Sequence, residues 1–436
     1  MKALAEFFLY FSLVILSCLM AGCTSEVETI GGTPETPENP QANDPNRRSV
    51  VISLQNKLIL VNGTPESRTI TRDGIAEEDE NRIESFDIYA FGSDKEEGPY
   101  TFQERFAYRS DAGTLPAGTS PLELKADEAA GKINVVFYPR KGLFTKFYCV
   151  ANQTEMDDAA GNTYTNYTPL QQSSQPQSSV PGDMVTSPGT PTESDFVKLN
   201  TPLLNSTGFN ADILLAPLPM SGANSQPTDL REYSMGTYVR LNVSLTRAVA
   251  RFDIVNDATK SHFTITDISM GNGRQGVTLF PIRPTGDVPA TNGQLITYPY
   301  RLFDGLNANV GTTTKAFYCY PCKAIDAGYL ILKGLYAMNL TDEKKEVSYR
   351  IPFERVTDGD GSLIEINHNH RYTVQITEAD PFELTANIRL VDWETGDYID
   401  DYEPDNGLET IAVADLLPVG ETTYDISTNI VTLALK

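Results

Sequence analysis

The sequence predicts an all-β protein built from two β-sandwich domains in tandem. Short runs of β-branched and aromatic residues, many alternating apolar and polar positions, recur between Gly, Pro, Asn and Asp residues. Convincing amphipathic helices are scarce, and 436 residues suit two domains of about 150 to 200 residues each. The predicted strands cover residues 50–61, 83–91, 133–138, 146–151, 238–245, 248–255, 263–270, 316–320, 329–338, 371–376 and 384–391.

The first residues predict export. Lys2 precedes an apolar run over residues 7–20, and the sequence LMAGC follows and closes at Cys23. This is the layout of a signal peptide, residues 1–22, and its end resembles the bacterial lipobox. The resemblance implies cleavage before Cys23 and fatty acyl chains, such as palmitate, on its sulfur. A transmembrane anchor is the alternative, but the run is shorter than the roughly 20 residues that span a bilayer.

Polar segments separate the predicted folded parts. Residues 23–48 are rich in Pro, Glu, Thr and Asn and nearly devoid of apolar residues, so we expect a flexible, disordered tether. Folded structure is expected from about Ser49. Residues 171–194 are predicted to form a long polar loop beside the first domain, and residues 397–406 an acidic, turn-rich break.

Charge and cysteine content restrict the function. With 34 Lys+Arg against 58 Asp+Glu, the formal charge of -24 disfavours nucleic acid and anionic lipid surfaces as partners. Cys18 leaves with the signal and Cys23 is acylated, so Cys149, Cys319 and Cys322 remain. Cys319 and Cys322 have the spacing of half a zinc site or a redox motif, but neither a second pair nor a strand-to-helix context accompanies them. We expect a dithiol or a local disulfide without a catalytic role.

No pattern for catalysis, metal binding or cofactor binding emerges. The string His368-Asn369-His370 lacks the metal-binding module and the basic surface of a nuclease, and residues 358–361 lack the spacing of a calcium loop. No phosphate loop or nucleophile elbow is present in the sequence. The prediction is therefore a protein without enzyme activity, catalytic residues, metal or cofactor.

A series of landmarks points to one family. After the predicted lipid site come the tether, a long apolar strand, a linker with arginines, the acidic run 77–80 and the strand 83–91. Five motifs follow in order: FYCVAN at 147–152, PMSG at 219–222, RAVARFDI at 247–254, NHNHRY at 367–372 and VDW at 391–393. Together they resemble the fimbrillins, the type V pilins of Bacteroidales that include major and minor fimbrial shaft subunits.

The resemblance implies transthyretin-like sandwiches and a strand that is lost on maturation. Residues 49–72 would be a removable first strand with its cleavage linker, 73–235 the N-terminal domain, 236–405 the C-terminal domain and 406–436 a donor-strand extension. An arginine-specific protease would cut after Arg72, or as second choice after Arg68; a cut at Arg47-Arg48 would leave the first strand attached. The displaced strand would contribute Val50, Ile52, Leu54, Leu58 and Leu60.

The chain ends in a segment suited to replace that strand. Residues 421–436 are strongly β-prone, and Val431, Leu433 and Leu435 fall on one face at period two. Ile426 and Ile430 add further apolar side chains. The alternative is an ordinary edge strand of the chain's own C-terminal sandwich.

The resulting hypothesis is a structural subunit of a fimbria (pilus) that supports adhesion. The lipidated precursor would reach the outer membrane, with membrane contact only through the lipid, and the cut protein would form an extracellular homopolymer by strand insertion, with separate tip and anchor subunits. The alternative is a surface lipoprotein that binds glycans or other ligands, which 21 Tyr but a single tryptophan, Trp393, make less favoured. A tip or anchor role is a third reading, against which the C-terminal tail and the Arg72 site argue.

Overall fold

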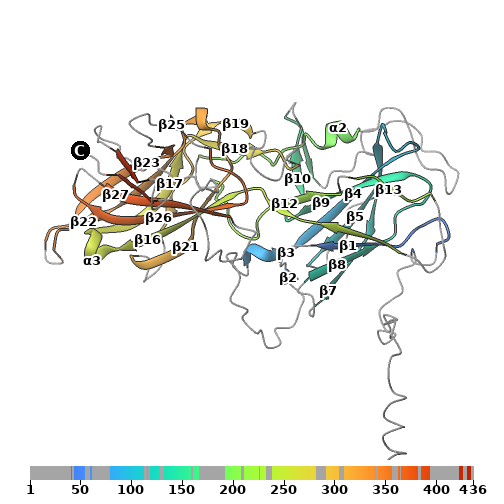
Figure 1. The fold of residues 1–436 in the computed structure, drawn as a ribbon, viewed down its shortest axis with the longest axis horizontal. Coiled ribbons are helices and arrows are strands. Elements are labelled where there is room, and N and C mark those ends of the chain that lie inside the picture. Colours follow the sequence, from blue (N-terminus) through green and yellow to red (C-terminus); the bar gives the residue numbers. More distant parts are fainter. Residues whose placement is uncertain are drawn as a thin grey trace, which may run out of the picture. The chain divides into compact units, whose positions relative to one another are not determined.

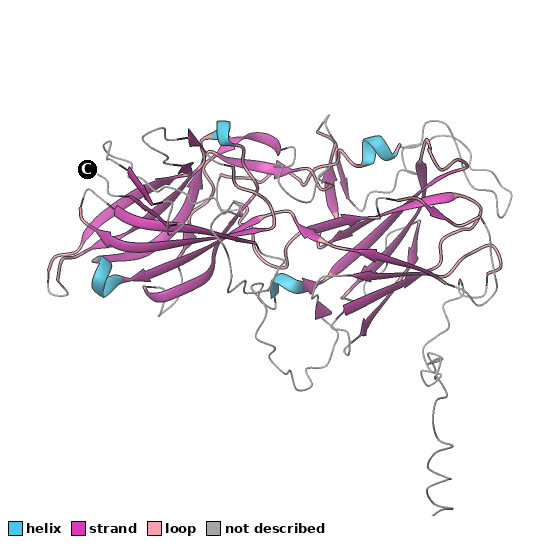
Figure 2. Cartoon of the chain, viewed as in Figure 1, coloured by secondary structure: helices cyan, strands magenta, loops and turns pink. Residues whose placement is uncertain are grey.

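The computed structural model describes a subset of the 436 residues. These are residues 41, 44–54, 59–60, 79–111, 115, 118–127, 132–158, 161–165, 192–207, 211–224, 226–231, 238–280, 291–303, 309–339, 342–355, 362–363, 365–381, 384–392, 422–425 and 430–433. Over these residues the protein is nearly all β (Figures 1 and 2), which confirms the predicted fold class. No helix among them combines the length and the apolar character needed to cross a bilayer.

Two facing sheets form the first sandwich. One sheet has four strands in the order β14 (Val239–Val243), β1 (Val50–Leu54), β8 (Lys132–Phe137) and β7 (Glu123–Asp127). The other follows the path β15 (Thr246–Arg247), β12 (Met220–Ala223), β9 (Phe144–Ala151), β4 (Ser85–Ser93), β5 (Thr101–Arg109) and β6 (Thr119–Pro121), with β13 (Thr228–Asp229) also on β9.

Apolar side chains from both sheets fill the space between them. Every second residue of β8 is buried, as expected for a strand with one face on a core. The ring of Phe137 lies 4.9 Å from that of Phe106 and 5.2 Å from that of Phe147, centroid to centroid, so the four-stranded sheet packs directly on β5 and β9.

The second sandwich repeats this plan. Its first sheet has the order β21 (Val310–Cys319), β16 (Ala250–Asp257), β26 (His370–Ala379) and β27 (Leu384–Asp392). Its second has the order β20 (Arg301–Leu302), β17 (Phe263–Gly271), β22 (Tyr329–Tyr336) and β23 (Lys345–Pro352). Phe252 stacks on both Phe353 and Tyr372 within the core between them.

Short elements complete the chain. Five two-stranded pairs and four short helices are present among the described residues: β2 (Ile59–Leu60) with β3 (Arg82–Ile83), β10 (Glu155–Asp157) with β11 (Thr163–Thr165), β18 (Gly273–Val277) with β19 (Thr291–Ile296), β24 (Glu354–Arg355) with β25 (Ser362–Leu363), β28 (Thr422–Asp425) with β29 (Ile430–Leu433), η1 (Asp79–Asn81), α2 (Glu193–Phe196), α3 (Ala258–Ser261) and η3 (Ala324–Asp326).

The predicted strand 50–61 requires a correction. It is not one ladder, because β1 ends at Leu54 and β2 pairs separately with β3. Leu54 pairs with Ile133 near the start of β8 and with Val243 at the end of β14. Residues 55–58, between the two described parts of the predicted strand, lie outside the described residues.

The pairing around β14 also bears on the predicted domain limits. β14 and β15 fall within the predicted second domain, 236–405, yet they pair with β1 and β12 of the first sandwich. The chain therefore completes the first sandwich before it enters the second. The limits as a set remain a prediction.

Candidate assembly site: strand β1 and its groove

The sequence of β1 has the alternation of a half-buried strand. The side chains of Val50, Ile52 and Leu54 are fully buried in the core of the first sandwich, whereas Val51 and Ser53 are partly exposed on the other face. Three of the five residues are β-branched aliphatics (Val50, Val51 and Ile52), which favour the extended backbone. Three of the five residues predicted for the displaced strand thus lie in the core, and their displacement stays a prediction.

β1 is a central strand. It pairs in parallel with β14, from Val50 with Val239 onward, and antiparallel with β8, from Val50 with Phe137 onward. The amide of Val239 also donates to the carbonyl of Ser49 at 3.0 Å. Because β14 and β8 are held together through β1, loss of this strand would leave two rows of backbone groups and an apolar floor in need of partners.

Side chains and backbone groups also hold β1 and its flank. Ser53 Oγ donates to Asn134 Oδ1 at 2.7 Å. Ahead of the strand, Arg47 Nη1 lies 2.9 Å from Glu104 Oε2, and the amide of Arg48 donates to the carbonyl of Pro139 at 2.9 Å. Ladder hydrogen bonds, three apolar side chains and the Ser53 contact thus all hold the strand.

Several predicted site residues lie outside the described parts of the chain. These are Cys23, Leu58, Arg68, Arg72, Trp393, Ile426 and Leu435. Leu60 lies in β2, and Ile430, Val431 and Leu433 lie in β29, which pairs with β28 as a hairpin and runs close to β27 of the second sandwich. The removal of β1 and the donor role of the C-terminus remain predictions.

The chain after the predicted linker begins with a buried ionic contact. Glu80, in η1, is fully buried; its Oε2 lies 2.7 Å from Arg251 Nη1 on β16, and its Oε1 accepts from Tyr318 Oη on β21 at 2.5 Å. Arg251 Nε also donates to Asp253 Oδ1 at 2.6 Å. We call Glu80, Arg251, Asp253 and Tyr318 the Glu80 clamp. It joins the chain that leads into β4 to the first sheet of the second sandwich.

Charge within the Glu80 clamp is balanced against burial. Burial alone would lower the pKa of Arg251. The hydrogen bond to Asp253, the charge of Asp253 and then the charge of Glu80 outweigh burial, so the pKa lies above its usual value. Burial, followed by the charge of Glu80, raises the pKa of Tyr318, so its hydroxyl stays a donor. At the edge of the clamp, Lys315 Nζ lies 3.0 Å from Asp79 Oδ2, and Arg247 Nη2 donates to Asn81 Oδ1 at 2.5 Å.

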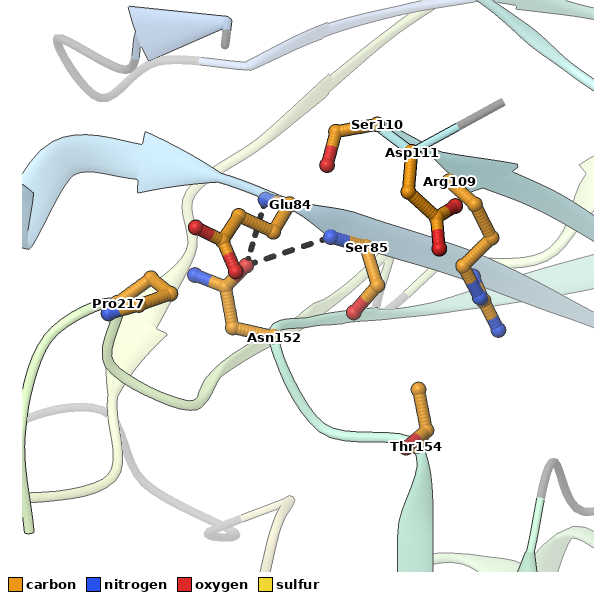
Figure 3. A pocket seen from close by; sticks show the side chains of 8 residues that line it. All are labelled: Glu84, Ser85, Arg109, Ser110, Asp111, Asn152, Thr154 and Pro217. Atoms are coloured by element: carbon orange, nitrogen blue, oxygen red, sulfur yellow. Dashed lines mark hydrogen bonds between the residues drawn. The ribbon is translucent and has the colours of Figure 1, made fainter. Parts of the chain in front are cut away.

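The Asn that ends the FYCVAN motif ties three segments together. Asn152 has a left-handed backbone, φ 57°, and its Oδ1 accepts from the amides of Glu84 at 2.9 Å and Ser85 at 3.4 Å (Figure 3). Its Nδ2 donates to the carbonyls of Arg82 at 2.8 Å and Leu218 at 3.0 Å. The sequence motif is therefore explained by a side chain that fixes the entry to β4.

A polar pocket of about 260 Å³ lies beside this Asn (Figure 3). Its lining includes Arg109, whose Nη2 contacts both oxygens of Asp87, at 3.1 and 3.0 Å. Arg105 Nη2 lies 2.7 Å from the same carboxylate. Arg109 thus joins β5 to β4 through Asp87.

The thiols and histidines show no sign of reactivity. Cys149, Cys319 and Cys322 are buried free thiols, and burial raises the pKa of each, that of Cys322 to about 12. Of the two predicted states, the dithiol is present. Burial, followed by the neighbouring His370, lowers the pKa of His368 to about 4. No group of three or more His, Cys, Asp or Glu side chains suited to a metal occurs among the residues that the structure covers.

The Glu80 clamp was not predicted. Glu80 is separated from Arg251 by 171 positions and from Tyr318 by 238, so no local pattern links it to its partners. Two signals were present: the acidic run 77–80, and Arg251 and Asp253 at alternate positions of an otherwise apolar strand. Neither signal identifies the partner.

The geometry defines a double β-sandwich protein with β1 as a central strand of the first sandwich. No protein-family model and no curated protein matches the sequence. Among solved structures, the tip fimbrial protein Mfa3 from Porphyromonas gingivalis with C-terminal truncation is 14% identical, with coverage of 80% of this chain and 100% of that chain and a TM-score of 0.44. A fimbrial assembly protein from Parabacteroides distasonis is 13% identical, with coverage of 79% and 96% and a TM-score of 0.42.

A further similar structure is the fimbrial anchor protein Mfa2 from Porphyromonas gingivalis. It is 10% identical, with coverage of 81% of this chain and 100% of that chain and a TM-score of 0.30. These three structures are fimbrial proteins of Bacteroidales.

Proposed function

We propose that the chain is a structural subunit of a cell-surface fimbria that supports adhesion. The precursor is lipidated at Cys23 and carried to the outer membrane, and an arginine-specific protease cuts after Arg72, or after Arg68. The cut releases β1, and the C-terminal segment of a neighbouring copy takes its place. Tip and anchor subunits complete the fimbria.

The observation that carries this proposal is the position of β1. It lies in the middle of a sheet and supplies three fully buried side chains, while its other face carries Val51 and Ser53. Burial of three such side chains contributes on the order of 5 to 9 kcal/mol before entropy is counted. Such a strand stabilises the sandwich and can still be exchanged for another of the same pattern.

The C-terminus has that pattern. In β1 the buried residues are Val50, Ile52 and Leu54, and the tail offers Val431, Leu433 and Leu435 at the same spacing. Insertion in the direction of β1 would place these side chains over the same floor, with main-chain pairing to β8 and β14. A strand buried in this way leaves only when the sandwich opens, which gives a kinetically stable, non-covalent fibre.

N-terminal sequencing of protein sheared from cells tests the maturation. A shaft subunit begins at Asp73 or Thr69. Sheared material that retains an acylated Cys23 contradicts the proposal and favours the ligand-binding lipoprotein.

A paired substitution tests the donor strand. Leu433→Asp places a charge on the face predicted to enter the groove, so chains cut after Arg72 should remain monomers. The matched control, Thr432→Asp, lies on the opposite face and should still form ladders resistant to mild denaturant. Polymers that survive Leu433→Asp would remove the donor role from this segment.

A further inference from the structure

A further arginine lies just beyond the predicted linker. Arg82 belongs to β3, and its side chain is 39% exposed, paired at 3.1 Å with a Glu84 side chain that is 45% exposed. An arginine-specific protease therefore meets an accessible recognition side chain at Arg82. The peptide bond that it would cut, between Arg82 and Ile83, is instead held in place by contacts on both sides.

The residues on the carboxyl side of that bond are fixed. Ile83 is fully buried in the core of the first sandwich. The carbonyl of Arg82 accepts from Asn152 Nδ2 at 2.8 Å, and the amide of Glu84 donates to Asn152 Oδ1 at 2.9 Å. Cleavage of this bond requires that the segment detach from both contacts.

The residues on the amino side are fixed by the Glu80 clamp. Glu80 and Arg251 side chains are 0% and 1% exposed, and their contact is supported by Tyr318 and Asp253. Asn81 and Asp79 add contacts to Arg247 and Lys315. Breaking a buried charge pair costs free energy because the remaining charge is left without a partner or water. Local unfolding of residues 79–81 is therefore unfavourable.

Proteases act on extended, locally opened chain, and the rate of cleavage follows the population of the open form when closing is fast. We infer that the Glu80 clamp directs maturation to Arg68 and Arg72 by withholding the bond after Arg82. Glu80 is thus a residue that determines cleavage specificity without contacting the protease. This inference rests on the proposed function for the cleavage itself.

The alternative cut would be damaging. Hydrolysis adds water across the Arg82–Ile83 peptide bond and leaves a carboxylate on Arg82 and an amine on Ile83. It would separate Glu80 from the mature chain. Arg251, which lies in the second sandwich, would then lose its contact with the Glu80 carboxylate. The clamp keeps the boundary between the removed and the retained chain ahead of Asp79.

Trypsin serves as an arginine-cutting probe of the full chain. Mass spectrometry follows the appearance of fragments that begin at Ile83, Asp73 or Thr69 in the wild type, Glu80→Ala, Glu80→Gln and Glu84→Gln. We expect fragments from Arg68 or Arg72 in all four proteins. We expect the Ile83 fragment to form at least about 100-fold faster in Glu80→Ala than in the wild type.

Controls keep this test decisive. Glu80→Gln preserves the shape of the clamp while removing its charge, so it should also expose the Arg82 bond if Glu80→Ala fails to fold. Glu84→Gln breaks the exposed pair beside Arg82 and should cut like the wild type. Wild-type resistance at Arg82 in the folded Glu80 variants, or equal sensitivity of Glu84→Gln, overturns the inference. If the wild type resists trypsin at Arg68 and Arg72 while Glu80→Ala is cut at Arg82, the proposed function is overturned. The protection of the Arg82 bond by the Glu80 clamp would still stand.

Discussion

The first strand of each sandwich, β1 and β16, lies between one parallel and one antiparallel neighbour. β1 lies between β14 and β8, and β16 lies between β26 and β21. Both place alternate aliphatic or aromatic side chains in a core. Their other faces differ. β1 carries Val51 and Ser53 there, whereas β16 carries Arg251 and Asp253, both buried in the ionic network with Glu80.

Their connections to the rest of the chain differ as well. β16 continues through α3 directly into β17, and Asn256 near its end donates to the carbonyl of Phe263 and to Asn309 Oδ1, both at 2.8 Å. β1 is followed by the short β2, which ends at Leu60, and then by η1, which begins at Asp79. Under the proposed function, a central position in a sheet does not decide whether a strand is permanent. We expect outward-facing polar contacts and short connections to decide it.

The largest expected difference comes from Arg251→Ala. The substitution leaves the buried carboxylates of Glu80 and Asp253 without their main cation, so we expect the second sandwich to lose about 3 to 5 kcal/mol of unfolding free energy. Urea unfolding measures it. Lys260→Ala removes an 80% exposed partner of Asp257 near the end of the same strand and should change little. An equal loss of unfolding free energy in both variants would show that the buried ionic network does not hold β16 more firmly than an exposed ion pair.

Truncation of one core residue in β1 and one in β16 compares how much each strand stabilises the protein before and after cleavage. Ile52→Ala and Ile254→Ala each delete a fully buried side chain, and each should cost about 2 to 5 kcal/mol in the uncut chain. After cleavage and release of β1, Ile52→Ala should have no further effect, while Ile254→Ala should keep its full cost. Persistence of the Ile52→Ala effect in cut protein would show that β1 is retained.

Acid should weaken the second sandwich selectively, because all three histidines of the chain lie there and one is buried. The folded-state pKa of His368 is about 4, below the value of about 6.5 for an unfolded histidine. The unfolded state thus binds more protons, and stability that is full above pH 6.5 falls by up to about 3 kcal/mol as the pH drops to 4. Urea unfolding at pH 7 and 4.5 should show this loss in the wild type, and His368→Leu should flatten it. An unchanged slope in the variant would assign acid sensitivity elsewhere.

The smallest expected effects concern single polar ties. Ser53→Ala removes the hydrogen bond to Asn134 and should cost about 0.5 to 1.5 kcal/mol. Asn256→Ala removes two donated bonds and the bond accepted from Ser261 Oγ, and should cost at least twice as much. Comparable values from urea unfolding would contradict the view that β16 is the more firmly tied strand.

Local patterns predicted much of this architecture. The predicted strands 83–91, 146–151 and 263–270 overlap β4, β9 and β17. Such strands can be predicted because the order of apolar and polar residues indicates which side chains are buried. The two neighbours of β1 were not predictable, since β8 and β14 lie far from it in the sequence. The separate pairing of β2 with β3 also depends on a partner more than twenty positions away.

The polar contacts were beyond the reach of pattern analysis for a different reason. Arg251 and Asp253 read as charged interruptions of a strand, and only the fold shows that Glu80 and Tyr318 cover them. Asn152 was recognised as part of a motif, but the partners of its four hydrogen bonds lie in two distant segments, residues 82–85 and Leu218. Such contacts require coordinates because their members have no fixed spacing.

The parallel pairing of Val50 with Val239 has a consequence for biogenesis. During synthesis and export, the earliest strand must wait until more than half of the chain has emerged before its parallel neighbour exists. Closing so large a loop is slow compared with local hairpins such as β4 with β5. The sheet that holds the groove is therefore expected to be the last part of the first sandwich to form, with β1 arriving as its final piece.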